Sequence, residues 1–264
     1  MKKEIKKTVE GLGLKAYGDL VMINGELFPL PLVEGNSKIG NVWHASTMPT
    51  NKDITIIKDG TEYHCKGTCP LTCKGCYGTK GNYNYNSVKY VLMMRTRLLR
   101  EYPEIYFALV KAQIKAEGIK LIRLHATGDF IKGEAKGWAD VFQTFAGVRG
   151  WTYTKCVFDA DIKALDHLPN FNIVKSIIKG CGFNFGHIGY ILKTWHKLKA
   201  MGKDVYICRC GIDKNQHCDT CKGCASHEYV LFIEHSTAYK AIKDALYNVI
   251  QDIIESQPKQ EAEW

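Results

Sequence analysis

The chain has 264 residues, of which 45% are hydrophobic and 24% are charged, and its formal charge is +9. This length and composition are ordinary for a soluble protein with one sizeable core. No apolar run approaches the roughly 20 residues that span a bilayer, and the basic N-terminus lacks the apolar stretch of a secretory signal. We therefore expect no transmembrane segment and no export signal.

The eleven cysteines fall mainly into two short clusters, at 65–76 and 208–224. An extracellular disulfide scaffold would be smaller, with its cysteines spread more evenly. Clusters in a chain of this size predict metal sites in a reducing, cytoplasmic setting. Metal-bound thiolates would also offset part of the positive charge. The remaining charge is compatible with nucleic acid as a partner, although a solvated basic surface is the simpler interpretation because no dense Lys/Arg run occurs.

Residues 1–60 are predicted to form an N-terminal region of β-hairpins. The pair Asn24-Gly25 lies between the apolar runs VMI and ELF, which is a strong signal for a two-residue hairpin turn. Asp59-Gly60 predicts a second hairpin, which leads into the first cysteine cluster.

Strands and helices alternate over residues 61–207, which we expect to form one α/β core. Two helices come first, at 87–101 and 103–117, with Pro103 in a first helical turn and Gly118 as a C-terminal cap. The strands predicted after them are 120–126, 150–155, 171–177 and 204–210, and the helices are 134–147, 159–168 and 187–201. Alternation predicts a parallel sheet. The predicted strand–helix units are too few for a complete eight-fold barrel, so we expect a partial (β/α) barrel.

The first cysteine cluster contains Cys69, Cys73 and Cys76 in a C-x3-C-x2-C spacing. Three thiolates on one loop can hold three irons of a 4Fe-4S cube and leave the fourth iron open, whereas ordinary electron carriers use four cysteines. This loop resembles that of radical S-adenosylmethionine enzymes. Two alternatives stay open because of Cys65, namely a closed cluster that uses it and a zinc site on all four cysteines.

A Thr-Gly-Asp turn follows the predicted strand 120–126. Thr127, Gly128 and Asp129 would lie at the carboxyl end of that strand, where α/β proteins build their sites. Glycine lets the backbone approach a ligand closely, and the carboxylate would take the ammonium group of a bound methionine moiety. By strand alternation we expect Arg123 and His125 to share one face and to line a polar lumen. The alternative is an ordinary turn that caps the next helix.

The predicted strand 150–155 ends in Lys155. We expect this side chain to pair with a carboxylate or phosphate of the cofactor; the alternative is a lysine that extends its charged end into solvent.

The second cysteine cluster belongs to a C-terminal segment, 208–264, that also contains a predicted strand at 228–235 and a final helix at 237–255. Its expected metal ligands are Cys208, Cys218, Cys221 and Cys224, with Cys210 as the spare. The spacing suits an auxiliary 4Fe-4S cluster and also suits zinc, so the metal stays open.

Three motifs together resemble the phage gene-product-88-like proteins, a group related to radical S-adenosylmethionine enzymes. The motifs are CPLTCKGCYG, then RLHATGDF followed by WTYTK, and the terminal C-x9-C-x2-C-x2-C run, over roughly residues 60–235. The resemblance implies a cluster on the first cysteine trio, a cofactor turn at Gly128 and Asp129, and a terminal metal site. It names no substrate.

We therefore expect a radical enzyme. Its site-differentiated 4Fe-4S cluster, reduced by an external electron donor, would cleave S-adenosylmethionine and generate a 5′-deoxyadenosyl radical that attacks an unnamed substrate. The alternative is a non-enzymatic iron–sulfur or zinc protein that binds nucleic acid, and the α/β pattern between the clusters argues against it. A radical enzyme that acts on nucleic acid would account for both the cysteine clusters and the basic charge.

Overall fold

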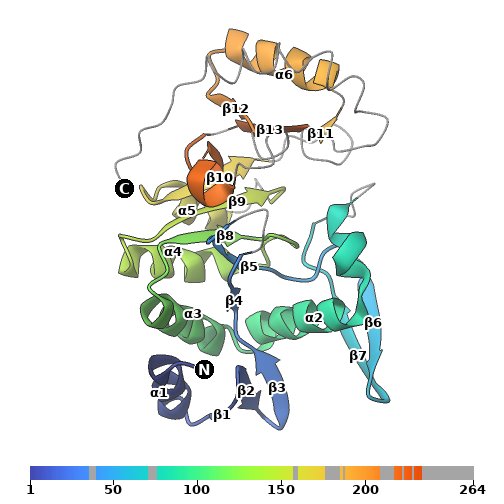
Figure 1. Ribbon diagram of the computed structural model, residues 1–264, viewed down its shortest axis with the longest axis vertical. Helices are drawn as coiled ribbons and strands as arrows, with labels where there is room; N and C mark the ends of the chain where they lie inside the picture. The colour runs from blue at the N-terminus through green and yellow to red at the C-terminus, as the bar shows by residue number, and fades with distance from the viewer. Residues whose placement is uncertain are drawn as a thin grey trace.

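The computed structural model describes residues 1–35, 40–70, 76–156, 160–175, 185–186, 188–208, 217–221, 223–227 and 229–233 (Figure 1). Three of the features predicted above lie outside these residues: Cys73, Cys210 and the helix at 237–255.

The N-terminal region consists of one helix and a three-stranded antiparallel sheet. Helix α1 (Lys3–Gly11) precedes strands β1 (Lys15–Tyr17), β2 (Leu20–Ile23) and β3 (Glu26–Pro29), which pair in chain order. Asn24 and Gly25 form the predicted turn, and both have positive φ, as a two-residue hairpin requires. Ile5 and Val9, one helical turn apart, bury the inner face of α1 in the main core.

A five-stranded sheet forms the centre of the molecule, in the order β10-β9-β8-β5-β4 (Figure 1). Its strands are β4 (Leu32–Val33), β5 (Trp43–Ala45), β8 (Leu121–Leu124), β9 (Arg149–Thr154) and β10 (Phe171–Lys175). Strands β5, β8, β9 and β10 are mutually parallel and lie side by side in chain order, while β4 pairs antiparallel at one edge. The parallel pairing predicted for the strands at 120–126, 150–155 and 171–177 is therefore present. The strand predicted at 204–210 is different, because residues 205–207 pair in a separate sheet.

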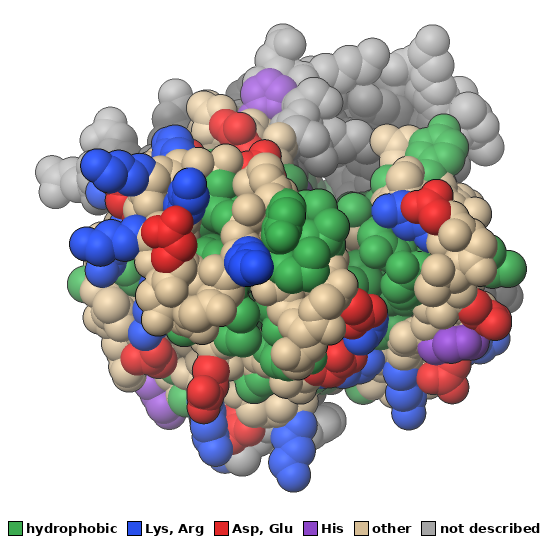
Figure 2. Space-filling model, turned by 90° about the horizontal axis from the view of Figure 1, so that it is seen from below, with side chains coloured by type: hydrophobic (Ala, Val, Ile, Leu, Met, Phe, Trp, Pro, Cys, Tyr) green, Lys and Arg blue, Asp and Glu red, His purple; other side chains and the backbone are tan. Residues whose placement is uncertain are grey.

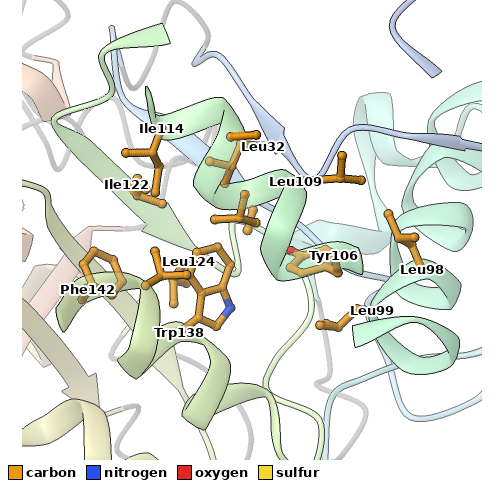
Figure 3. Close-up of a cluster of buried hydrophobic side chains, with 14 of the residues drawn as sticks. Leu32, Leu98, Leu99, Tyr106, Leu109, Ile114, Ile122, Leu124, Trp138 and Phe142 are labelled. Atoms are coloured by element: carbon orange, nitrogen blue, oxygen red, sulfur yellow. The ribbon is translucent and has the colours of Figure 1, made fainter. Parts of the chain in front are cut away.

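The helices between these strands cover one face of the sheet. They are α2 (Asn86–Glu101), α3 (Pro103–Glu117), α4 (Glu134–Thr144) and α5 (Lys163–Asp166). Tyr106 and Leu109 of α3 and Trp138 of α4 pack with Ile122 and Leu124 of β8 in one buried cluster (Figure 3). As expected, Pro103 begins α3, and Gly118 ends it in the left-handed conformation.

The remaining elements are a hairpin and a second parallel sheet. The hairpin of β6 (Asp53–Lys58) and β7 (Thr61–Lys66) turns at Asp59-Gly60, as predicted, and leads into the first cysteine cluster. The second sheet has the strand order β11-β13-β12. Its strands are β11 (Phe185–Gly186), β12 (Val205–Ile207) and β13 (Tyr229–Ile233). Helix α6 (Ile188–Ala200) and the single-turn helix α7 (Cys218–Cys221) lie between these strands in sequence. Within the described residues the sheets are open, so the partial barrel stays a prediction.

Strand β4 lies at the edge of the central sheet, and a side chain covers its outer side. The amide of Gln113, from α3, accepts a hydrogen bond from the Leu32 N–H (2.9 Å) and donates one to the Leu32 carbonyl (2.9 Å). Gln113 is buried. Both backbone groups of Leu32 are thereby satisfied without another strand.

Candidate functional site

The first cysteine cluster begins alongside the segment that follows β5. The N–H of Thr68 donates to the Met48 carbonyl and that of Cys69 to the Thr50 carbonyl, both at 2.9 Å. At Gly67 an added Cβ would lie 2.2 Å from the Thr50 carbonyl oxygen, so only glycine permits this approach of two backbones. The start of the cysteine loop is thus fixed to the carboxyl end of β5.

Three buried threonines join this segment to the predicted Thr-Gly-Asp turn. The Thr47 N–H donates to the Thr127 carbonyl (3.0 Å), and the Thr127 hydroxyl donates to the Thr47 carbonyl (2.9 Å). Thr68 Oγ1 lies 3.0 Å from Thr47 Oγ1 and accepts a hydrogen bond from the Asp129 N–H (2.8 Å). Gly128 has φ 86°, and an added Cβ would lie 2.0 Å from Thr47 Oγ1. The turn and the cysteine loop therefore form one hydrogen-bonded unit.

The carboxylate of Asp129 extends this unit to β9. Oδ1 accepts hydrogen bonds from the Thr154 hydroxyl (2.6 Å) and the Phe130 N–H (2.9 Å), and Oδ2 accepts one from the Lys155 N–H (2.9 Å). Asp129 is only 2% exposed. A carboxylate has about four acceptor positions, and the protein uses three of them here. The backbone of Lys155 contacts Asp129, and its half-buried side chain lies close enough to Cys69 to influence that thiol electrostatically.

The described cysteines of this cluster have different surroundings. Cys69 and Cys76 are half-buried, and burial, with the nearby charge of Asp129, raises the pKa of Cys69 to about 12. Gly78, two residues after Cys76, packs against Pro49 and Thr127. The end of the cysteine loop therefore lies against the same Thr-Gly-Asp turn as its start. Cys65 instead points from β7 into an apolar cluster with Met48, Ile56, Leu92 and Met93, and burial raises the pKa of its thiol.

A cleft of about 730 Å³ opens beside Cys69. Its walls come from the start of the cysteine loop, the junction of α2 and α3, and the loop that enters α4. Apolar side chains (Leu99, Phe107 and Phe130) and cationic ones (Lys66 and Arg100) line it. Its volume is in the range of small-molecule sites.

Arg123 and His125 lie on opposite faces of the sheet, so the prediction of a shared face is wrong. The Arg123 guanidinium lies over the Tyr153 ring at 5.2 Å, whereas His125 Nδ1 is 3.2 Å from Thr152 Oγ1. Thr152 and Tyr153 are neighbours on β9 and therefore point to opposite faces. The cause is the backbone: β8 ends at Leu124, and His125 has φ 52°, a left-handed conformation that interrupts strand alternation.

His125 is buried in a network with the first turn of α4. Its Nε2 lies 3.0 Å from Glu134 Oε1, and Glu134 also accepts hydrogen bonds from Trp138 Nε1 and the Ile131 N–H, both at 3.0 Å. Burial opposes a positive charge on His125, but the Glu134 carboxylate outweighs burial, so the pKa of His125 is raised. Both ring nitrogens are engaged by the protein itself.

The second cysteine cluster covers the sheet face that the helices leave open. Cys208 and Cys224 pack with Trp151, Tyr153 and Tyr206 in one buried cluster, and Cys218 and Cys221 lie against it. Among the described residues, no three His, Cys, Asp or Glu side chains are already arranged to hold a metal ion. The structure therefore brings the four predicted ligands into one cluster without a finished coordination geometry.

The Gene product 88 family model matches residues 31–235 of the chain. The chain belongs to this family. It is also similar to the Gene 88 protein of Mycobacterium phage D29, with 26% identity over a 164-position alignment that covers 54% of this chain and 67% of that protein. No solved structure matches it significantly. The predicted relationship to phage gene-product-88 proteins is confirmed.

For this gene product 88 family member, sequence reasoning found the cysteines and the turn but missed Thr47, Thr68 and Glu134. Thr68 directly precedes Cys69, which was its only signal. Thr47 carries none because its partners Thr68 and Thr127 are 21 and 80 residues away, and Glu134 has the pattern of an ordinary acidic residue in the first turn of a helix. In the part of the chain that the structure describes, no helix combines the length and apolar character needed to cross a bilayer.

Proposed function

We propose that this protein is a radical S-adenosylmethionine enzyme whose site lies where β5, β8 and β9 end. The observation that carries the proposal is the attachment of the cysteine loop to the Thr127–Asp129 turn through Thr68. It brings Cys69, the backbone around Gly128 and the carboxylate of Asp129 to one edge of a parallel sheet. Ligands of open α/β sheets bind at this carboxyl edge.

The order of the strands supports a partial (β/α) barrel. Strands β5, β8, β9 and β10 are parallel neighbours in chain order, with helices covering one face. The cysteine loop follows the first of them, and the Gly-Asp turn follows the second.

Cys69, Cys73 and Cys76 would hold a 4Fe-4S cluster with one open iron. When bound, such a cluster supplies the electron for reductive cleavage of S-adenosylmethionine chelated at that iron. The residues present suit it: Cys69 is a half-buried thiol with a raised pKa, and a metal centre would stabilise its thiolate form. Cys65 faces an apolar cluster, which favours the three-cysteine set over a closed site.

The chain's own residues would bind and orient the cofactor. The carboxylate of Asp129 would take an ammonium group, and the side chain of Lys155 would pair with a carboxylate. The cleft beside Cys69 has room for a small molecule. Hydrogen bonds among the threonines hold these groups in place before a ligand arrives, which lowers the entropic cost of binding.

Two cysteine variants test the proposal. Anaerobically reconstituted Cys69→Ala should lose cluster iron and should release neither methionine nor 5′-deoxyadenosine from S-adenosylmethionine. Cys65→Val, a matched change only four residues away, should keep both properties. Circular dichroism of the two variants would confirm that each is folded. Wild-type protein that binds no iron–sulfur cluster, or Cys69→Ala that cleaves the cofactor normally, would refute the proposal.

The binding of nucleic acid is the alternative function. On the face shown in Figure 2, basic and acidic side chains are interspersed, which is unlike the one-sided basic surface typical of such proteins. Steeply salt-dependent binding of DNA by cluster-free protein would favour this alternative.

A further inference from the structure

The cleft beside Cys69 is separate from the groups proposed to hold the cofactor. Cys69 lines it, whereas Asp129 and Lys155 are not among its lining residues in the described part of the chain. The junction of α2 and α3 and the loop that enters α4 form the other walls. A ligand in the cleft would therefore lie next to a metal cluster on Cys69 without competing for the contacts of Asp129.

Three exposed cationic side chains border the cleft, namely Lys66, Arg100 and Lys132. The Arg100 guanidinium donates hydrogen bonds to the carbonyls of Lys66 and Gly67, the second at 3.0 Å. These neutral acceptors hold the guanidinium in place without compensating its charge. By contrast, Arg97, one helical turn earlier on α2, pairs with two carboxylates. Uncompensated positive charge at a cleft favours an anionic ligand.

Glu134 is the one carboxylate among the described lining residues, and its charge is directed inward. Its side chain is 1% exposed. Oε1 lies 3.0 Å from His125 Nε2 and accepts a hydrogen bond from Trp138 Nε1 (3.0 Å), while Oε2 accepts one from the Ile131 N–H (3.0 Å). Glu134 therefore shapes the wall of the cleft, and the charge that the cleft presents to a ligand is positive.

The apolar part of the cleft is held in place by the core. Leu99 and Phe130 belong to the main buried cluster, part of which Figure 3 shows, and Phe107 packs against it. The Phe107 ring meets the Trp138 ring edge-to-face, with 5.5 Å between centroids, and the Phe130 ring meets the His125 ring in the same way at 4.4 Å. These contacts fix the rings before a ligand arrives, which favours binding of a rigid apolar group.

We propose that this cleft binds the substrate, and that the substrate is a small molecule with a carboxylate or phosphate group on an apolar, ring-sized body. The oxyanion would contact Arg100 and Lys132, because a guanidinium forms paired hydrogen bonds with either group. The apolar body would lie against Phe107 and Phe130. The assignment of this ligand as a substrate rests on the proposed radical function, whereas its binding rests on the cleft alone.

Binding of four simple compounds tests the inference. Isothermal titration calorimetry of the full-length reconstituted protein, without S-adenosylmethionine, would compare phenyl phosphate, phenylacetate, inorganic phosphate and benzyl alcohol. One of the two aromatic oxyanions should bind at least about tenfold more tightly than inorganic phosphate or benzyl alcohol, because each of these lacks half of the recognised chemistry. The stronger of the two identifies the oxyanion as phosphate or carboxylate.

Two substitutions locate the binding. Arg100→Gln should weaken it by about tenfold, and Lys132→Gln, which removes a side chain exposed to solvent, by about threefold. Lys136→Gln makes the same charge change four residues later and outside the cleft, so it should leave the affinity unchanged. The Lys132 and Lys136 pair keeps the test valid even if Arg100→Gln disturbs the loop that it holds.

Equal affinity for benzyl alcohol and the aromatic oxyanions, or equal effects of the Lys132 and Lys136 substitutions, would overturn the inference. Oxyanion binding by a protein that never cleaves S-adenosylmethionine would overturn the assignment as a substrate and leave a ligand site. Cleavage of S-adenosylmethionine without oxyanion binding would instead overturn the inference and leave the proposed function standing.

Discussion

Replacing Gly128 by alanine should separate the Thr-Gly-Asp turn from the cysteine loop. Gly128 has φ 86°, and the new Cβ would lie 2.0 Å from Thr47 Oγ1 and 2.7 Å from Thr68 Oγ1. The left-handed backbone costs a non-glycine residue about 1–2 kcal/mol. Overpacking a buried contact adds about 1–3 kcal/mol. We expect the free energy of unfolding to fall by about 2–5 kcal/mol, because both contributions act together at this position.

Gly133 provides a matched control for the backbone contribution. Its φ is 85°, but an added Cβ would meet nothing within 4 Å. Gly133→Ala should therefore lose only about 1–2 kcal/mol. Equilibrium unfolding in urea, fitted with a common slope, measures both losses, and their difference is the steric contribution at Gly128. Equal losses in the two variants would refute the close approach of the turn to Thr47 and Thr68.

Two further predictions concern buried ionisable side chains. Asp129→Asn should lower the free energy of unfolding by about 1.5–3 kcal/mol, because an amide replaces a carboxylate that accepts hydrogen bonds from Thr154 and Lys155; an unchanged urea midpoint would contradict this. Burial, together with the charges of Arg123 and Arg95, lowers the pKa of His44 from 6.5 to about 4. The folded state thus resists protonation of His44, so this side chain should contribute a loss of about 3 kcal/mol in the free energy of unfolding as pH falls from 6.5 to 4. His44→Gln should lose less over the same range, and identical pH profiles would count against the prediction.

The sequence predicted the elements that carry strong local signals. Pro103 and Gly118 set the ends of α3, and the pairs Asn24-Gly25 and Asp59-Gly60 set two hairpins. The alternation of strands and helices predicted the parallel sheet. These signals act within a few residues, so they can be recognised without knowledge of tertiary contacts.

Other features depend on distant partners and were missed. Strands β4 and β5 have only two and three residues, and pairing within the sheet defines them rather than their composition. The short helix α1 is stabilised by the core that it covers. His125 departs from alternation because its backbone is left-handed, and its ring then contacts Thr152 and Glu134. The cysteines of the first cluster were found by spacing, but the threonines that position them are separated by up to 80 residues.

The amide of Gln113 has a consequence for aggregation. A strand edge with free N–H and carbonyl groups is a template on which a second molecule can add a strand. Gln113 occupies the N–H and carbonyl groups of Leu32 by hydrogen bonding, so the native protein resists intermolecular pairing along β4. Because this protection comes from α3, it is absent until α3 has docked. The vulnerable species is therefore a partly folded chain in which the sheet has formed before the helix that covers its edge.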